Sequence, residues 1–285
     1  MNTIKQAFLI TALSLSNLAA LNLLTAKPAF SAACGTPGNY AAFTTAAGQN
    51  GCSGTPSAYG IKVYKIGFCN ANPLAGGAGT TPDYSSCTLT FQDTTGAEAS
   101  FAAGENISLP NNRTTPPTPG AYPFAIIEIS NSFTIAAELT IGNDTYYSTT
   151  TPDANGRGTV ADKTANAATA FTFPVKTFAA NCVATQQFNN VGGANLTASL
   201  LNGTDQIIAN SNNANCGAGT SKIVGVAQLG TPFTITPETK SCLASFTVTD
   251  SGATFVPSTG AEQNNGDQNV FVLPGPFRVA FTIAE

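Results

Sequence analysis

The segment SFTIAAELTIG, residues 132–142, alternates apolar side chains with mostly polar ones. A period of two is typical of a β-strand that has one face in the core and the other in solvent. The core face would carry Phe133, Ile135, Ala137, Leu139 and Ile141. The opposite face would carry Thr134, Ala136, Glu138 and Thr140. We therefore predict that this whole segment is one half-buried strand.

The C-terminal segment repeats the pattern. Its core face would carry Phe277, Val279, Phe281 and Ile283, after Pro274 and Pro276 at the start of the strand. Arg278, Ala280 and Thr282 would face solvent. Further strands are expected at residues 61–69, 87–91, 122–130, 171–178, 196–201, 223–229, 242–249 and 270–273. Beyond residue 33, no segment has the period near 3.6 that predicts a helix.

Stretches rich in turn-forming and polar residues separate these strands at 70–82, 110–120 and 152–166. They leave no room for the helical crossovers that parallel strands need. We therefore predict an all-β fold, built as an antiparallel two-layer β-sandwich with long loops. Residues 34–285 would form one elaborated sandwich, or two smaller ones divided within residues 150–168.

Residues 1–33 have the features of a signal peptide. Lys5 precedes the apolar run 7–24, and the small residues Ser31-Ala32-Ala33 suit cleavage after Ala33. Polar interruptions make this run a poor membrane-spanning helix. An alternative is lipidation of Cys34, which would tether the protein to a membrane; Ser31 argues against it, because lipoprotein signals usually carry an aliphatic residue there. The protein is expected in the periplasm, at the cell surface or secreted.

Composition restricts the possible chemistry. The chain has no histidine, which excludes Ser-His-Asp and Cys-His catalysis and histidine-ligated metals. It also contains no G-x-S-x-G, S-x-x-K or P-loop sequence. The net charge of −4 disfavours binding to nucleic acid and anionic lipid. We expect no enzymatic activity and no cofactor.

Seven cysteines in an exported chain predict disulfides, with one cysteine left over. Cys34 with Cys52 and Cys69 with Cys87 form two spans of equal length, each enclosing a turn-rich segment, so local pairs are the simplest framework. Cys182 would pair with Cys216 or with Cys242. Without a C-x-x-C pair or histidine, zinc ligation is not indicated. The loops 153–158 and 264–267 lack the complete ligand set of a calcium loop, so no metal is expected.

The segment Pro119-Gly120-Ala121-Tyr122, followed by the apolar run 123–129, resembles a strand start found in transthyretin-like and other immunoglobulin-like bacterial surface sandwiches. Together with residues 61–69, the resemblance covers about a quarter of the chain and implies the fold only. Proteins with such folds include adhesins, pilus components, carbohydrate-binding modules and scaffolds, so the resemblance assigns no function.

Two carboxylates and two tyrosines are the candidate site residues. Glu128 and Glu138 could form the acid pair of a glycoside hydrolase. Glu138, however, is expected in solvent, and Glu128 is expected to pair with Lys62 or Lys65. Tyr146 and Tyr147 would point to opposite faces of a strand, one into the core and one outward. With the loop 70–82, one of these rings could form a glycan or small-ligand site.

Two functional hypotheses follow. The first is a structural or interaction protein of the cell exterior, whose partners are other surface proteins or further copies of itself. The C-terminal segment of residues 277–283, with its alternating pattern, resembles the last strand of a donor-strand pilin. Such pilins have tyrosine at the penultimate position, where this chain has Ala284. The second is a secreted module that binds a glycan or another small ligand.

Overall fold

The computed structural model describes residues 20–21, 33–48, 51–101, 114–115, 117–152, 158–178, 182–191, 194–211, 216, 219–239, 241–257 and 270–284. Within these ranges the fold is nearly all-β, with 59% of residues in strands and one short helix, and all named strands pair antiparallel. The predicted all-β, antiparallel class is confirmed. The predicted signal peptide lies almost entirely outside the described residues.

The largest sheet, here called the large sheet, has eight strands in the order β10-β6-β3-β5-β13-β12-β11, with β4 also paired to β3. Its strands are β3 (Ala58–Cys69), β4 (Cys87–Phe101), β5 (Gly120–Ser130), β6 (Ser132–Ala136), β10 (Phe171–Pro174), β11 (Thr185–Val191), β12 (Ala194–Asn202) and β13 (Thr220–Ile235).

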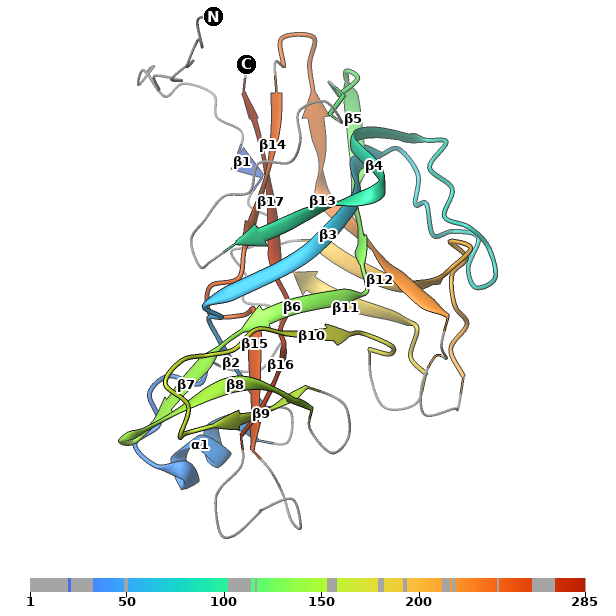
Figure 1. Ribbon diagram of the computed structural model, residues 1–285. Helices are drawn as coiled ribbons and strands as arrows, with labels where there is room; N and C mark the ends of the chain where they lie inside the picture. The colour runs from blue at the N-terminus through green and yellow to red at the C-terminus, as the bar shows by residue number, and fades with distance from the viewer. Residues whose placement is uncertain are drawn as a thin grey trace, which may run out of the picture.

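Two further sheets complete the molecule (Figure 1). The C-terminal sheet has the order β1-β17-β14, with β1 (Ala20–Leu21), β17 (Arg278–Ala284) and β14 (Ser241–Thr247). The lower sheet, at the bottom of Figure 1, has the order β2-β15-β16-β9-β8-β7. Its strands are β2 (Cys52–Gly54), β7 (Glu138–Ile141), β8 (Asp144–Pro152), β9 (Thr159–Asp162), β15 (Ala253–Pro257) and β16 (Val270–Pro274).

The last four strands link the C-terminal and lower sheets. The chain runs from β14 into β15 and returns from β16 into β17, so the two pairs lie end to end along the molecule (Figure 1). We call their junction, residues 248–252 and 275–277, the seam. There the Gly275 N–H donates to the Gly252 carbonyl at 2.8 Å. A Cβ on Gly275 would lie 1.9 Å from the Ser251 carbonyl oxygen, so only glycine allows this close approach of the two backbones.

The segment 132–142 forms two strands, so the prediction of one strand was wrong. β6 ends at Ala136 in the large sheet, and β7 begins at Glu138 in the lower sheet. The alternation persists on both sides of the break, while Ala136 and Ala137 are both buried. The Ala137 N–H donates to Ser148 Oγ at 3.1 Å, which replaces the missing strand partner. A period of two predicts which side chains are buried, but not the sheet to which they belong.

The structure also contains elements that the sequence did not predict. The helix α1 (Tyr40–Ala47) begins at Asn39, whose side chain accepts a hydrogen bond from the Ala42 N–H at 2.9 Å. It ends at Gly48, which has a φ of 54°. The prediction of no helix was wrong because eight residues, mostly Ala and Thr, are too few to show an apolar period. β2, β9, β11 and β15 were also missed, and β9 lies within the polar stretch 152–166.

Aromatic side chains join the large sheet to β17. Phe68 of β3 stacks on Phe233 of β13 with ring centroids 4.4 Å apart, and Phe281 of β17 meets Phe68 edge-on at 5.0 Å. Tyr122 is buried beside them, and its hydroxyl donates to the Thr118 carbonyl at 2.8 Å. The face of the large sheet that points toward β17 is therefore the interior face.

Candidate ligand-binding site

A cavity of about 430 Å³ lies between the interior face of the large sheet and β17. This volume is within the range of about 300–1,000 Å³ that is usual for small-molecule sites. Its floor is formed by alternate residues of three neighbouring strands, β5, β13 and β12, which therefore share one face of the sheet. The floor residues are Ala125, Ile127, Ile129, Ile223, Gly225, Ala227, Ala194, Leu196 and Ala198.

Small side chains on the floor leave the space that forms the cavity. Gly225 pairs with Ala198 on one side and with Ile127 on the other. Ala227 likewise lies between Leu196 and Ala125. Larger residues at these positions would extend into the space that the cavity occupies. The hollow thus follows directly from alanine and glycine at alternate positions of adjacent strands.

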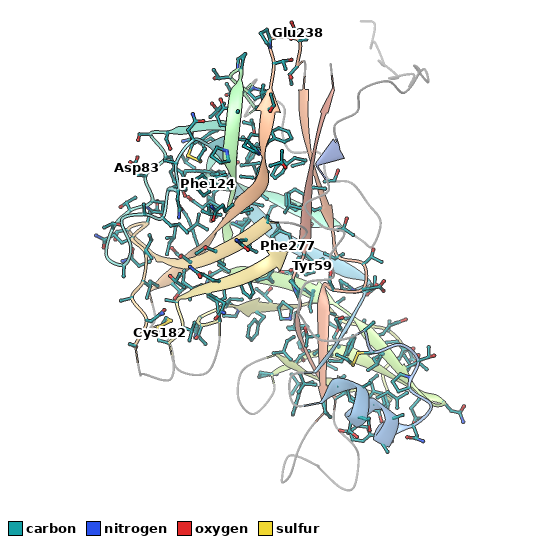
Figure 2. All side chains as sticks on the ribbon, turned by 180° about the vertical axis from the view of Figure 1, so that it is seen from behind. Tyr59, Asp83, Phe124, Cys182, Glu238 and Phe277 are labelled. Atoms are coloured by element: carbon teal, nitrogen blue, oxygen red, sulfur yellow. A yellow bond between two sulfur atoms is a disulfide. The ribbon has the colours of Figure 1, made fainter. Side chains whose placement is uncertain are left out.

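The wall opposite the floor comes from the C-terminal strand and the seam. Phe277 and Val279 line the cavity and are only half-buried, whereas Phe281 at its end is buried. Figure 2 shows Phe277 beside Tyr59 near the middle of the molecule, and their ring centroids are 6.3 Å apart. The alternating pattern correctly placed these side chains toward the large sheet, but it could not show that a cavity separates them from it.

The cavity is almost free of polar groups, and none of the described residues that line it is charged. Ser251, in the seam, is the exception of interest: it is 3% exposed, and its Oγ has no hydrogen-bond partner among the described residues. Such an apolar space holds water poorly, because water needs two to four polar partners. The arrangement can therefore bind an apolar molecule, with one hydroxyl available to it.

Sequence reasoning missed this site. The sequence predicted strands at β5, β12 and β13 but assigned no core face to them, and nothing was inferred from their small residues. The signal that could have found it is the combination of Ala194, Ala198, Gly225 and Ala227 on two strands that pair with each other. Recognising that signal requires the strand register, which the sequence alone does not provide.

The tyrosines proposed for ligand binding lie elsewhere. Tyr146 and Tyr147 are in β8 of the lower sheet, where Tyr146 is buried and Tyr147 is half-buried. Neither lines the cavity. The structure thus brings neither tyrosine to the candidate site.

Six of the seven cysteines form disulfides. Cys34 is bonded to Cys52 and Cys69 to Cys87, the two local pairs that the sequence favours. Cys182 is bonded to Cys216, one of the two partners that the sequence left open, and the side chain of Cys242 lies outside the described residues. The Cys34 sulfur is bonded to Cys52, which favours an N-terminal segment held by a disulfide over one that is lipidated. Three disulfides indicate an oxidising, extracellular environment.

A second cluster of functional groups lies on the opposite face of the large sheet, around Glu128. This residue alternates with the floor residues of β5 and is 1% exposed. Its Oε2 is 2.6 Å from Lys65 Nζ and accepts a hydrogen bond from the Tyr84 hydroxyl at 2.7 Å. Its Oε1 lies 3.1 Å from Lys222 Nζ but accepts no hydrogen bond, so that contact is one of charge alone. The predicted pairing with Lys65 is present, whereas Lys62 pairs with Glu98 at 3.1 Å.

The charges in this cluster balance. Lys222 also donates to Asp205 at 2.8 Å, so two lysines face two carboxylates. Burial acts against the charged form of Lys222, but the hydrogen bond to Asp205 and the charge of Glu128 together raise its pKa. Burial raises the pKa of Tyr84 well above its usual range, and the neighbouring Glu128 charge adds to this. A buried cluster whose charges balance favours a structural role, in which Tyr84 and Asp205 fasten their segments to the sheet.

The two carboxylates considered as a catalytic pair, Glu128 and Glu138, lie in different sheets. Glu138 is exposed on β7 in the lower sheet, while Glu128 is buried on β5 in the large sheet. The described residues contain no group of three or more Cys, Asp or Glu side chains that could hold a metal ion. The loop 264–267 and most of the loop 153–158 lie outside the described residues.

Comparison of the chain with protein-family models, curated proteins and solved structures gives no match. Among the described residues, no helix has the length and hydropathy needed to span a membrane.

Proposed function

We propose that this is an exported binding protein that holds a small apolar ligand in the cavity between the large sheet and β17. The observation that carries the proposal is the cavity itself, with its volume of about 430 Å³ and its uncharged lining. Burial of apolar ligand surface would contribute about 25 cal/mol per Å² before the costs of association. The protein would act by binding rather than by catalysis.

The large and C-terminal sheets support a finer description of the fold under the same proposal. They would form an immunoglobulin-like or transthyretin-like sandwich in which the C-terminal layer is much narrower than the layer facing it. A narrow second layer leaves part of the interior face uncovered, and the ligand would fill that space. The ligand would thus replace side chains that a complete sandwich supplies.

A fluorescence titration tests the proposal. Mature protein, residues 34–285, is titrated with the apolar probe N-phenylnaphthylamine, whose emission rises in an apolar site. The variant Ala227→Phe fills the floor and is expected to lower probe affinity at least tenfold. Ala78→Phe, in an exposed loop away from the cavity, is the matched control and should bind as the wild type does. Equal binding by both variants, or no binding by the wild type, would rule the proposal out.

A second candidate function is a structural or interaction protein of the cell exterior. The observation that favours it is the strand β14, which pairs with β17 and has no second partner among the described strands. Unpaired N–H and C=O groups at a sheet edge can accept a strand from another chain. Self-association or contact with another surface protein through this edge would be the mode of interaction.

A further inference from the structure

Ser251 marks one end of the cavity as different from the rest. The residue lies in the seam, where its N–H donates to the Val248 carbonyl at 3.2 Å and its backbone meets Gly275. Its hydroxyl is buried without a partner among the described residues. A buried polar group that makes no hydrogen bond destabilises the folded protein, so a retained one calls for an explanation. The explanation we consider is a ligand atom that forms a hydrogen bond with this hydroxyl.

The charge around Ser251 restricts what that ligand atom can be. No lysine or arginine is among the described residues lining the cavity. A carboxylate or phosphate head group would lose its hydration there and find no counter-ion among the described residues that line the cavity. A neutral head group has none of these costs.

We propose that the natural ligand is a neutral amphiphile with one hydrogen-bonding group. Its hydrocarbon body would lie on the floor formed by β5, β13 and β12, and its hydroxyl or carbonyl oxygen would pair with Ser251 Oγ. The serine hydroxyl can donate or accept, so alcohols, aldehydes, ketones and esters all satisfy it. This inference rests on the proposed function, because it names the class of ligand for the same cavity.

Three probes of equal chain length test the inference by displacing N-phenylnaphthylamine: dodecanol, dodecane and dodecanoate. The wild-type protein is expected to bind dodecanol more tightly than either of the others. Ser251→Ala should lower dodecanol affinity about fivefold to tenfold, the worth of one neutral hydrogen bond, and leave dodecane affinity unchanged. Ser100→Ala, at an exposed serine outside the cavity, is the matched control.

The possible outcomes distinguish failure of the inferred ligand class from failure of the proposed binding function. Equal affinities for dodecanol and dodecane, tighter binding of dodecanoate, or an equal loss for both neutral probes in Ser251→Ala would overturn the inference while the cavity remained a binding site. Failure of every probe to bind would overturn the proposed function as well. Ser251→Ala removes an unpartnered hydroxyl and should unfold at the same temperature as the wild type or a higher one, which confirms that any loss of binding is local.

Discussion

Among single residues, the most distinctive groups are two tyrosines, Tyr59 buried and Tyr84 half-buried, whose ionisation the fold opposes. Tyr59 is 1% exposed and donates to the Gly275 carbonyl at 2.9 Å, and burial raises its pKa well above the usual range. Tyr84 is affected in the same direction by burial and by Glu128. Both side chains therefore keep their protons in the folded protein at a pH where the unfolded chain loses them.

This difference predicts alkaline destabilisation. As pH rises above the usual tyrosine pKa of about 10, the free energy of unfolding should fall by up to about 1.4 kcal/mol per pH unit for each of these two tyrosines. Lys222, whose pKa is also raised, adds to the loss above about pH 10.4. Urea unfolding between about pH 9 and pH 11 measures the slope. Tyr59→Phe should be less stable near neutral pH but show a shallower alkaline slope; an unchanged slope would contradict the assignment.

At the scale of elements, the seam decides how the C-terminal strands serve two sheets. β14 and β15 follow each other along the chain, as do β16 and β17, yet each pair belongs to a different sheet. The change takes place where the backbones of Ser251 and Gly275 touch. The same contact positions Ser251 at the end of the cavity, so the seam links the fold to the candidate site.

A methyl group at Gly275 tests the importance of this contact. Gly275→Ala would place a Cβ 1.9 Å from the Ser251 carbonyl oxygen and 3.0 Å from the Ala253 nitrogen. We expect a loss of about 3 kcal/mol or more in unfolding free energy, measured by urea denaturation, because backbone rather than a flexible side chain must move. Gly203→Ala is the control: its Cβ would meet nothing within 4 Å, and it should change stability by less than about 0.5 kcal/mol. Equal losses of unfolding free energy in the two variants would contradict the prediction, because they would show that the backbone of the seam can move to accept a Cβ.

For the whole molecule, the edge of β14 that pairs with no second described strand predicts concentration-dependent association. If the edge recruits a second copy, light scattering after size-exclusion chromatography should show mass growing with protein concentration. Ser245→Lys on β14 places a charge, which natural edge strands use against pairing, in this strand and should favour the monomer. Ala78→Lys, in an exposed loop, is the control. A strictly monomeric wild-type protein at high concentration would exclude self-assembly through this edge.

Much of the architecture could be predicted from local pattern. The period of two identified the long strands and the face that each buries, as Phe133, Ile135 and Phe281 show. Equal spacing suggested Cys34–Cys52 and Cys69–Cys87 because short loops favour local pairs. The short helix α1 escaped prediction because two turns of Ala and Thr show no apolar period, although Asn39 and Gly48 mark its ends.

The all-β class, the alternating faces of segments 132–142 and 277–283, the disulfide-forming cysteines and the absence of histidine can all be inferred from the residues alone. The division of residues 132–142 between two sheets depends on the folded chain, as does the hollow that small residues on β5, β12 and β13 form opposite Phe277. The physical reason is that strand periodicity is a local property of the backbone, whereas register, sheet membership and cavities depend on contacts between residues far apart in the chain.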